Sequence, residues 1–347
     1  MEKLNPLFKL VRDYLTRYLP LERKSGKNTI RSYQKALELL FDYVKTQKNV
    51  PLAKVTFEMI DRYMLSAFLD YLEKERGCSP ETRNHRLHSI RAFYSYAAEN
   101  DITVIVHYEE ILKVDTANVV EKLVEHMSED AVKVIIAQPD TSTNKGLRDM
   151  FLMLLLYKTG ARIQEALDVR LKDIQFGKTP SITFYGKPNY TPRAVPLREN
   201  TTEHLKEYIK IFHPNEGVYS DQYLFFTIRS GAKKRMTEDN ARDFIRKYGV
   251  SARTICAEVP ESVHPHLFRH SCAMSLYQSG VHLTIISQWL GHAQLETTLI
   301  YAHADTEIKR KAIEKSIPKD TPLGKHVDSQ RYKVDDELVL KQLCGLI

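Results

Sequence analysis

Apolar residues recur at helical spacing through the first hundred residues, and no other feature of the sequence limits its fold so strongly. In "NTIRSYQKALELLFDYV" they fall three or four positions apart, with Asn28 or Thr29 available as the N-cap. "SPETRNHRLHSIRAFYSYAAEN" repeats the pattern behind a Ser79 cap and Pro80 at the first helical position. Similar spacing predicts helices over residues 5–19 and 57–75. We therefore expect residues 1–105 to form a helical bundle.

The periodicity weakens after this region and resumes in a second domain. Residues 106–125 are expected to be a linker, since "MSEDAVKVIIAQ" offers a fresh helix start with Ser128 as its cap. A length of 347 residues suits two domains, each large enough to bury a core. The second domain is placed at 126–316.

The second domain mixes structural types. Helical patterns cover "GLRDMFLMLLLYKTG", "ARIQEALDV" and residues 201–212, 237–249, 265–279 and 283–290, whereas "SITFYGKPNYTPRAVPL" alternates around a polar turn and predicts a β-hairpin. The expected fold class is mainly α with a small antiparallel β-sheet. Residues 317–347 read as a flexible segment followed by a C-terminal helix.

Composition narrows the partners and the compartment. The net charge of +7 favours polyanionic partners such as nucleic acids, but it does not by itself establish that the protein binds one. Four cysteines lie far apart without CxxC spacing, so a disulfide framework or a cysteine zinc site is not expected. The longest apolar runs, such as "MFLMLLLY", are too short to span a membrane, and no signal peptide opens the chain. We expect a cytoplasmic protein with no membrane contact.

Four cues in the second domain carry chemistry, and the last of them is the stretch "QWLGHAQLETTLIYAHAD", which contains Tyr301. Arg162 follows a Gly-Ala turn, Lys187 lies at the hairpin tip, and "HPHLFRH" sets His266 and Arg269 on one side of a helix start. Two arginine forks could hold the non-bridging oxygens of a phosphodiester. The hydroxyl of Tyr301 needs a base or a cationic setting to act as a nucleophile, and Lys187 could protonate a departing alkoxide.

Plainer explanations exist for each cue taken singly. Arg162 could simply pair with Glu165, Tyr301 could be a packed aromatic residue, and Lys187 an exposed turn residue. His266 and His270 have metal-ligand spacing with Cys272 near, but no glutamate lies between them as in HExxH enzymes. We therefore expect neither a metal nor another cofactor.

The ordered set "TGARIQEAL", "GKPNYTPRAVPL", "HLFRH", "LGH" and "TTLIYAH" resembles the tyrosine recombinase (phage integrase) family. The first domain resembles the core-binding, SAM-like domain of that family, so the resemblance covers about 310 residues and makes 126–316 the catalytic domain. It implies a two-domain recombinase that needs neither metal nor ATP.

The resemblance implies a role for each matched residue. Tyr301 would attack the scissile phosphate to give a 3′-phosphotyrosine link, while Arg162 and Arg269 hold its oxygens. His266 would handle the tyrosine proton, Lys187 would protonate the 5′ oxygen, and His292 would donate a supporting hydrogen bond.

The hairpin tip departs from the family pattern, because Pro188 and Tyr190 stand where small and basic residues are usual. Arg193 is therefore considered as a stand-in for Lys187. In the first domain, Arg86 and Arg91 are expected to reach a DNA backbone, the alternative being a solvated helix flank.

The expected partners are double-stranded DNA at recombination sites, further copies of the chain in a tetramer on DNA, and accessory DNA-bending proteins. The C-terminal helix, with Leu338, Leu343 and Leu346 as anchors, would dock on a neighbouring protomer or fold back on its own domain.

The expected role is integration or excision of a mobile element. Chromosome or plasmid dimer resolution and a catalytically inactive DNA-binding relative are alternatives. A type IB topoisomerase and a metal hydrolase built on the histidines stay open as other enzyme classes.

Overall fold

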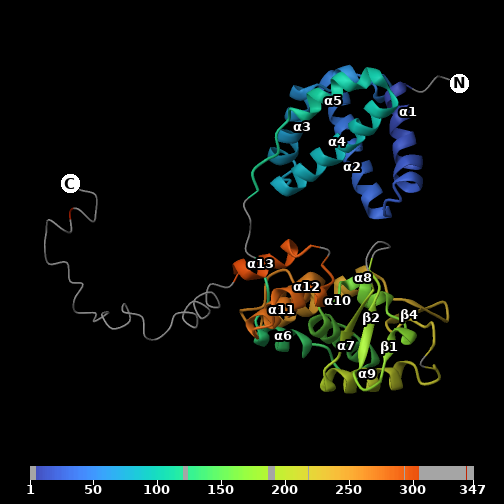
Figure 1. The fold of residues 1–347 in the computed structure, drawn as a ribbon, viewed down its shortest axis with the longest axis vertical. Helices are drawn as coiled ribbons and strands as arrows, with labels where there is room; N and C mark the ends of the chain where they lie inside the picture. Colours follow the sequence, from blue (N-terminus) through green and yellow to red (C-terminus); the bar gives the residue numbers. More distant parts are fainter. Residues whose placement is uncertain are drawn as a thin grey trace. The chain divides into compact units, whose positions relative to one another are not determined.

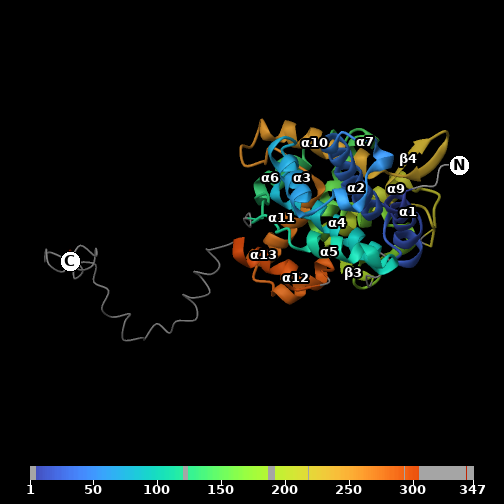
Figure 2. The ribbon, with the colours of Figure 1, turned by 90° about the horizontal axis from the view of Figure 1, so that it is seen from above.

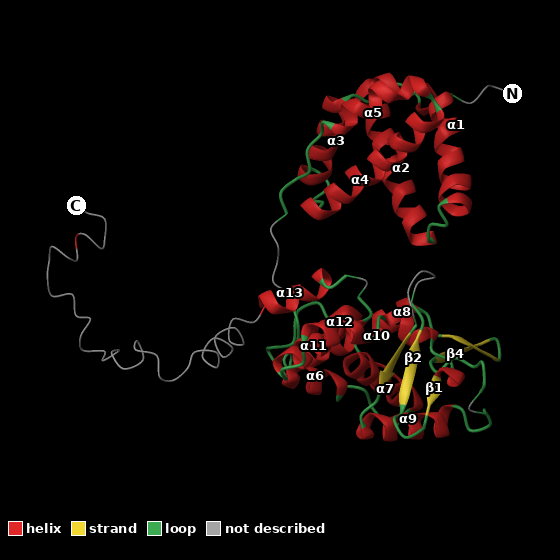
Figure 3. Ribbon diagram, viewed as in Figure 1, coloured by secondary structure: helices red, strands yellow, loops and turns green. Residues whose placement is uncertain are grey.

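The computed structural model describes residues 5–119, 124–186, 192–217, 219–292, 294–304 and 341. The chain divides into two compact units, residues 1–121 and 122–347, which are described separately below. Helices dominate both units, and strands occur only in the second among the described residues (Figure 3). No helix in the described part of the chain is both long enough and apolar enough to cross a membrane.

The first unit is a helical bundle around one apolar core. Its longest helices are α2 (Lys27–Lys48) and α4 (Pro80–Asn100), which pack against each other (Figure 1). The other helices are α1 (Pro6–Asp13), η1 (Tyr14–Glu22), α3 (Arg62–Lys74) and α5 (Ile105–Leu112), with single 3₁₀ turns η2 (Leu52–Lys54), η3 (Phe57–Met59) and η4 (Ile102–Val104).

Three predicted helix boundaries in this unit differ from the structure. α2 begins at Lys27 behind Gly26, before the predicted caps at Asn28 or Thr29. The single helix predicted over 5–19 is an α-helix followed by a nine-residue π-helix that contains Pro20, which has no N–H to donate. The helix predicted from 57 starts at Arg62, because the carboxylate of Asp61 accepts the N–H of Met64.

The first unit also extends further along the chain than its sequence pattern indicates. The expected linker at 106–125 begins inside α5, and Ile111 and Val114 are buried in the core of the first unit. The short α5 has too few turns for its apolar spacing to stand out in the sequence.

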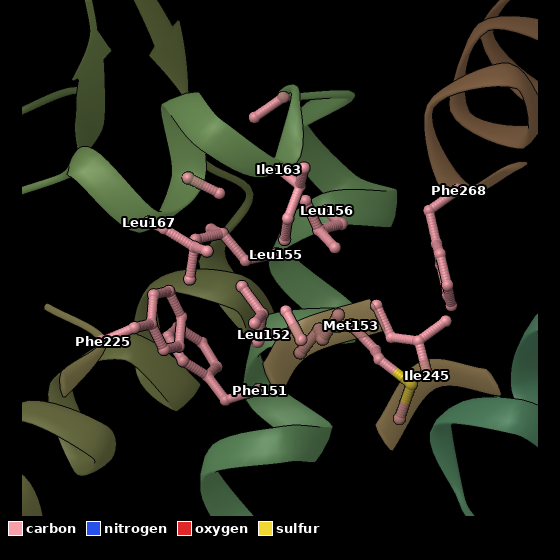
Figure 4. Packing of buried hydrophobic residues seen from close by; sticks show 14 of the residues in the cluster. Phe151, Leu152, Met153, Leu155, Leu156, Ile163, Leu167, Phe225, Ile245 and Phe268 are labelled. Atoms are coloured by element: carbon pink, nitrogen blue, oxygen red, sulfur yellow. The ribbon is translucent and has the colours of Figure 1, made fainter. Parts of the chain in front are cut away.

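The second unit is built around α7 (Asn144–Thr159). Six consecutive residues of this helix, 151–156, are buried, so the helix is covered on all sides rather than on one face. Figure 4 shows side chains from α7, α8 and α10 meeting Phe225 and Phe268 in this core. α9 (Glu199–Phe212) and α11 (Pro265–Gln278) pack against α7. The remaining helices are α6 (Glu129–Ile136), α8 (Ile163–Asp168), η5 (Leu171–Asp173), α10 (Glu238–Arg253), α12 (Leu283–Leu290) and α13 (Glu296–Ala304).

A three-stranded antiparallel sheet, β1–β2–β3, contains the predicted hairpin. β2 (Ser181–Phe184) pairs with β3 (Arg193–Pro196) so that Phe184 lies opposite Arg193, and β1 (Ile174–Gln175) pairs with β2. A second hairpin, β4 (Phe226–Arg229) and β5 (Ala232–Arg235), was missed by the sequence analysis. Its signal is the Ser230-Gly231 pair, where both residues have positive φ as a two-residue hairpin turn requires.

α11, α12 and α13 form the end of the second unit that carries the histidines and the tyrosine. α12 contacts both α11 and α13, and Figures 1 and 2 show α12 and α13 side by side from two directions. The fold class predicted from the sequence, mainly α with small antiparallel sheets, is confirmed.

Candidate active site

Arg162 lies at the sharp junction between α7 and α8. Gly160 ends α7 with a φ of +62°, and a Cβ at this position would lie 2.6 Å from Cδ2 of Leu290. Arg162 is the N-cap of α8, where its backbone N–H donates to Oε2 of Glu165 at 2.9 Å. Its Nη1 donates to Oε1 of the same carboxylate at 2.8 Å. The pairing of Arg162 with Glu165 is therefore present, and it orients an arginine whose side chain is still 35% exposed.

Arg269, on α11, is almost completely buried. Its Nη1 donates to the carbonyl of Gly160 at 2.7 Å, and its Nη2 donates to the carbonyl of Leu290 at 2.8 Å. One guanidinium thus joins the junction before Arg162 to the end of α12. Burial, together with repulsion from Arg162, lowers the pKa of Arg269 to about 10, so it remains charged at neutral pH.

His292 follows the end of α12, which Gly291 closes with a φ of +65°. Nδ1 of His292 forms a hydrogen bond of 2.8 Å with Oγ1 of Thr298, a buried residue of α13. Burial and the nearby arginines lower the pKa of His292 to about 4, so the ring is neutral at pH 7. Its Nε2 is the other ring nitrogen and the one that could meet a phosphate.

Tyr301, on α13, is only 1% exposed and packs among Met274, Ile286 and Leu290. Burial raises the pKa of its hydroxyl to about 12 despite the opposing charge of Arg269. The hydroxyl shares a hydrogen bond of 2.9 Å with Nδ1 of His270. Burial lowers the pKa of His270 to about 4. Both partners are therefore uncharged at neutral pH.

His266 lies in the first turn of α11 and is exposed. Partial burial of its ring and the charges of His264 and Arg269 lower its pKa. The hydroxyl of Tyr301 is bonded to His270 rather than to His266, the residue expected to handle its proton. Sequence reasoning considered His270 only as a metal ligand, and it gave no signal that this ring would meet Tyr301.

Arg193 and Lys187 are the two residues that the sequence offers as a general acid. Arg193 donates from Nη2 to Oε2 of Glu165 at 2.7 Å, so its fork is engaged inside the second unit. Lys187, the expected general acid, lies outside the described residues.

In the first unit, Nη2 of Arg91 donates to the carbonyls of Leu112 and Val114, which gives this arginine a structural contact with the segment after α5. Arg86 is half-buried, and its Nε has no hydrogen-bond partner among the described residues. Contact of either arginine with DNA stays a prediction.

Positive charge dominates the described part of this site. Arg162 and Arg193 both form ion pairs with the carboxylate of Glu165, and the charge of Arg269 lies near enough to interact with Arg162 and Glu165. An anion would therefore be attracted here. Burial alone would raise the pKa of Glu165, but Arg193 and Arg162 outweigh it and lower that pKa to about 2. The His, Cys, Asp and Glu side chains of the described residues form no group of three or more that could hold a metal ion.

The chain matches two protein families that together cover both units. The phage integrase family matches residues 125–307, and the phage integrase SAM-like domain matches residues 7–115. A Sinorhizobium fredii protein named as an integrase/recombinase, y4rC, is 30% identical over 340 residues, which are 98% of each chain. The tyrosine recombinase XerD of Staphylococcus epidermidis is 27% identical over 307 residues, covering 87% of this chain and 96% of its own.

The fold is shared with solved recombinases. The XerH site-specific recombinase, in a post-cleavage complex with a palindromic difH substrate, has a TM-score of 0.64 at 22% identity, covering 90% of this chain and 89% of that chain. The chain therefore belongs to the phage integrase family and is a site-specific tyrosine recombinase, an enzyme that cuts and rejoins DNA strands. The resemblance seen in the sequence is confirmed.

Proposed function

We propose that Tyr301 is the nucleophile and that Arg162, Arg269 and His292 bind the scissile phosphate. The observation that carries this proposal is the pair of hydrogen bonds from Arg269 to Gly160 and Leu290, because they hold the turn before Arg162 beside the turn before His292. Cations fixed in advance at one place stabilise the charge of a pentacoordinate transition state without reorganising during the reaction.

The chemical step conserves charge and bonds. Oη of Tyr301 forms a bond to phosphorus, and the bond from phosphorus to the 5′ oxygen breaks, leaving a 3′-phosphotyrosine. His266 takes the proton of the tyrosine, and Lys187 gives a proton to the 5′ oxygen. A 5′-hydroxyl from another strand then reverses these transfers and rejoins the DNA. The bond energy is kept in the covalent link, so the proposal needs neither ATP nor a metal.

The burial of Tyr301 supports a resting role for His270 in this scheme. A phosphodiester cannot reach the hydroxyl of a tyrosine residue that is only 1% exposed, so α13 has to shift before attack. The hydrogen bond to His270 holds the hydroxyl inside the protein until DNA is bound. His266 is exposed and lies near enough to Arg269 and Arg162 for their charges to affect it, which supports a role for His266 as the proton acceptor once Tyr301 has moved.

The test is covalent capture on a nicked suicide duplex whose cleaved end diffuses away. Wild type should give a denaturation-resistant protein–DNA adduct in the presence of EDTA, and Tyr301→Phe should give none. Tyr208→Phe is the matched control, because Tyr208 is also buried with its hydroxyl bonded, but to the carbonyl of Leu224. An adduct with Tyr301→Phe, or an adduct that EDTA abolishes, would overturn the assignment.

The proposed partners are double-stranded recombination sites and further copies of the chain, with accessory DNA-bending proteins, in the cytoplasm. Residues 317–340 and 342–347 lie outside the described residues, and we propose that the tail docks on a neighbouring protomer in a tetramer on DNA. Removing residues 317–347 should then leave DNA binding by single protomers intact while abolishing tetramers in sizing experiments. A truncated chain that still forms tetramers would contradict this role.

We propose integration or excision of a mobile element as the biological role. The support is the match to y4rC, which spans 98% of this chain, compared with 87% for XerD. Dimer resolution is the second candidate, because XerD covers both domains at similar identity. Deleting the gene and sequencing the junctions distinguishes them: loss of a circular excised element supports the first role, and unresolved chromosome or plasmid dimers support the second.

A further inference from the structure

Arg193, the alternative to Lys187 as general acid, has bonded partners on two sides. It begins β3, its side chain is 12% exposed, and its guanidinium lies 5.3 Å from the ring centroid of its cross-strand partner Phe184. Nη2 donates to Oε2 of Glu165 at 2.7 Å, and Nε donates to the carbonyl of Trp289 at 2.9 Å. A guanidinium with these bonds, which does not lose its proton in proteins, is a poor proton donor.

The contact with Glu165 determines how Arg162 is held. A free carboxylate and an arginine fork tend to form two parallel hydrogen bonds, which would turn the fork of Arg162 onto Glu165. Here Arg193 and the backbone N–H of Arg162 occupy Oε2, so the side chain of Arg162 meets only Oε1, through Nη1. The other guanidinium donors of Arg162 stay available for a phosphate.

The contact with Trp289 reaches the other side of the site. The last carbonyls of a helix have no partner within that helix. At the end of α12, the carbonyl of Trp289 is bonded by Arg193, and the next one, of Leu290, by Arg269. Gly291 completes the fit, since a Cβ there would lie 3.0 Å from Cδ and from Nη1 of Arg193. The turn that carries His292 is therefore built against Arg193.

We propose that Arg193 is a positioning residue for DNA cleavage, which holds Glu165 so that Arg162 presents its free donors to the scissile phosphate and which fixes the turn before His292. This inference rests on the proposed roles of Arg162 and His292. Arg193 also begins β3, six positions after Lys187 in the sequence, and Lys187 lies outside the described residues. A role at the leaving group is therefore the competing interpretation, and the experiment has to separate the two.

The experiment measures single-turnover cleavage on two suicide duplexes, one natural and one with sulfur in place of the 5′ bridging oxygen. A thiol has an ordinary pKa of about 8.5, so it departs without a general acid. Arg193→Gln should cleave both duplexes about 100-fold more slowly than wild type, because misplacing the phosphate clamp affects either leaving group equally. Lys187→Ala should be slow only on the natural duplex. Arg193→Lys should cleave faster than Arg193→Gln but more slowly than wild type, since lysine keeps the positive charge but lacks the planar fork of arginine.

Controls separate positioning from unfolding. Arg253 is a matched control, because it also donates to a carboxylate (Glu261) and to a backbone carbonyl (Val259). Arg253→Gln should therefore cleave DNA like wild type. Gly291→Ala should slow cleavage by crowding Arg193, whereas Gly280→Ala, which also has a positive φ but an open surrounding, should not. The fluorescence of Trp289, the single tryptophan, reports whether each variant's second unit is folded.

Several results would overturn the inference. If Arg193→Gln cleaved DNA at the wild-type rate, Arg193 would have no role in cleavage. If the sulfur duplex restored the rate of Arg193→Gln, Arg193 would act at the leaving group instead. Because only part of the effect of Arg193 passes through Arg162, the double variant with Arg162→Ala should be slower than Arg162→Ala alone by much less than the factor of about 100 expected for Arg193→Gln by itself. Additive losses would contradict that path. Failure of the proposed function looks different, because wild type itself would then give no adduct dependent on Tyr301.

Discussion

At the scale of single residues, the site depends on buried groups whose charge is set by their neighbours. Glu165 stays ionised because two arginines surround it, and Tyr301 and His270 stay neutral because they are buried together. The spacing of Arg162 and Glu165 could be read from the sequence, since residues three apart on a helix meet. The contact between Tyr301 and His270 could not be read from the sequence, because the two residues are 31 positions apart.

Glu165 should make the free energy of unfolding of the second unit depend on pH. Its pKa falls from an ordinary 4.5 to about 2 on folding. A lowered pKa stabilises the folded state above the ordinary value, and this contribution, roughly 3 kcal/mol, is lost as the pH falls toward the folded pKa. Urea unfolding followed by Trp289 fluorescence should show wild type more stable than Glu165→Gln near pH 7, with a gap that narrows below about pH 4.5. A gap that does not change with pH would contradict this coupling.

His270 and His266 should respond differently to substitution. His270→Phe keeps a ring in place but leaves the buried hydroxyl of Tyr301 without its hydrogen-bond partner. This destabilises the buried position of the tyrosine by about 1–3 kcal/mol and so favours its movement toward DNA. We expect suicide-duplex cleavage at least as fast as wild type. His266→Ala should be slower by about 10²–10⁴. Equal losses in the two variants would instead make His270 the proton acceptor.

At the scale of elements, α13 is attached to the rest of the site through two histidines. Thr298 and Tyr301 lie three residues apart on one face of α13, where they bond His292 and His270. The sequence predicted most helices of the second unit from apolar spacing, but not which residues of neighbouring elements would meet. Those contacts depend on how α11, α12 and α13 pack, which no local pattern encodes.

Thr298→Val should loosen α13 while preserving its shape. The substitution removes one hydrogen bond, worth about 1 kcal/mol, and leaves Nδ1 of His292 unpaired. Amide hydrogen exchange over 296–304 should become several-fold faster, because this segment opens more often. Thr297→Val is the matched control, since Thr297 is exposed, and it should exchange like wild type. Equal acceleration in both variants would show that Thr298 has no special part in docking.

At the scale of the whole molecule, the two units have separate cores, and a net charge of +7 favours a polyanionic partner. Binding to a cognate duplex should weaken steeply with salt, because each phosphate contact releases counterions. With about six contacts the affinity should fall about 10³-fold between about 50 and 200 mM salt. The slope should be unchanged in Tyr301→Phe, since its charge is the same. Titrations that are insensitive to salt would argue against a backbone-dominated interface.

The mainly helical domains, the β2–β3 hairpin and the order of the family motifs could all be predicted from the amino-acid sequence, because helical periodicity, caps and turn residues act over a few neighbouring positions. Packing of the folded chain, in contrast, brings two arginines to Glu165, bonds Arg193 and Arg269 to the last carbonyls of α12, and brings His270 to Tyr301. These contacts join residues 21 to 96 positions apart, except for the local pairing of Arg162 with Glu165. Their partners are chosen by packing of the buried core, where an unpaired donor or charge is costly, and not by spacing along the chain.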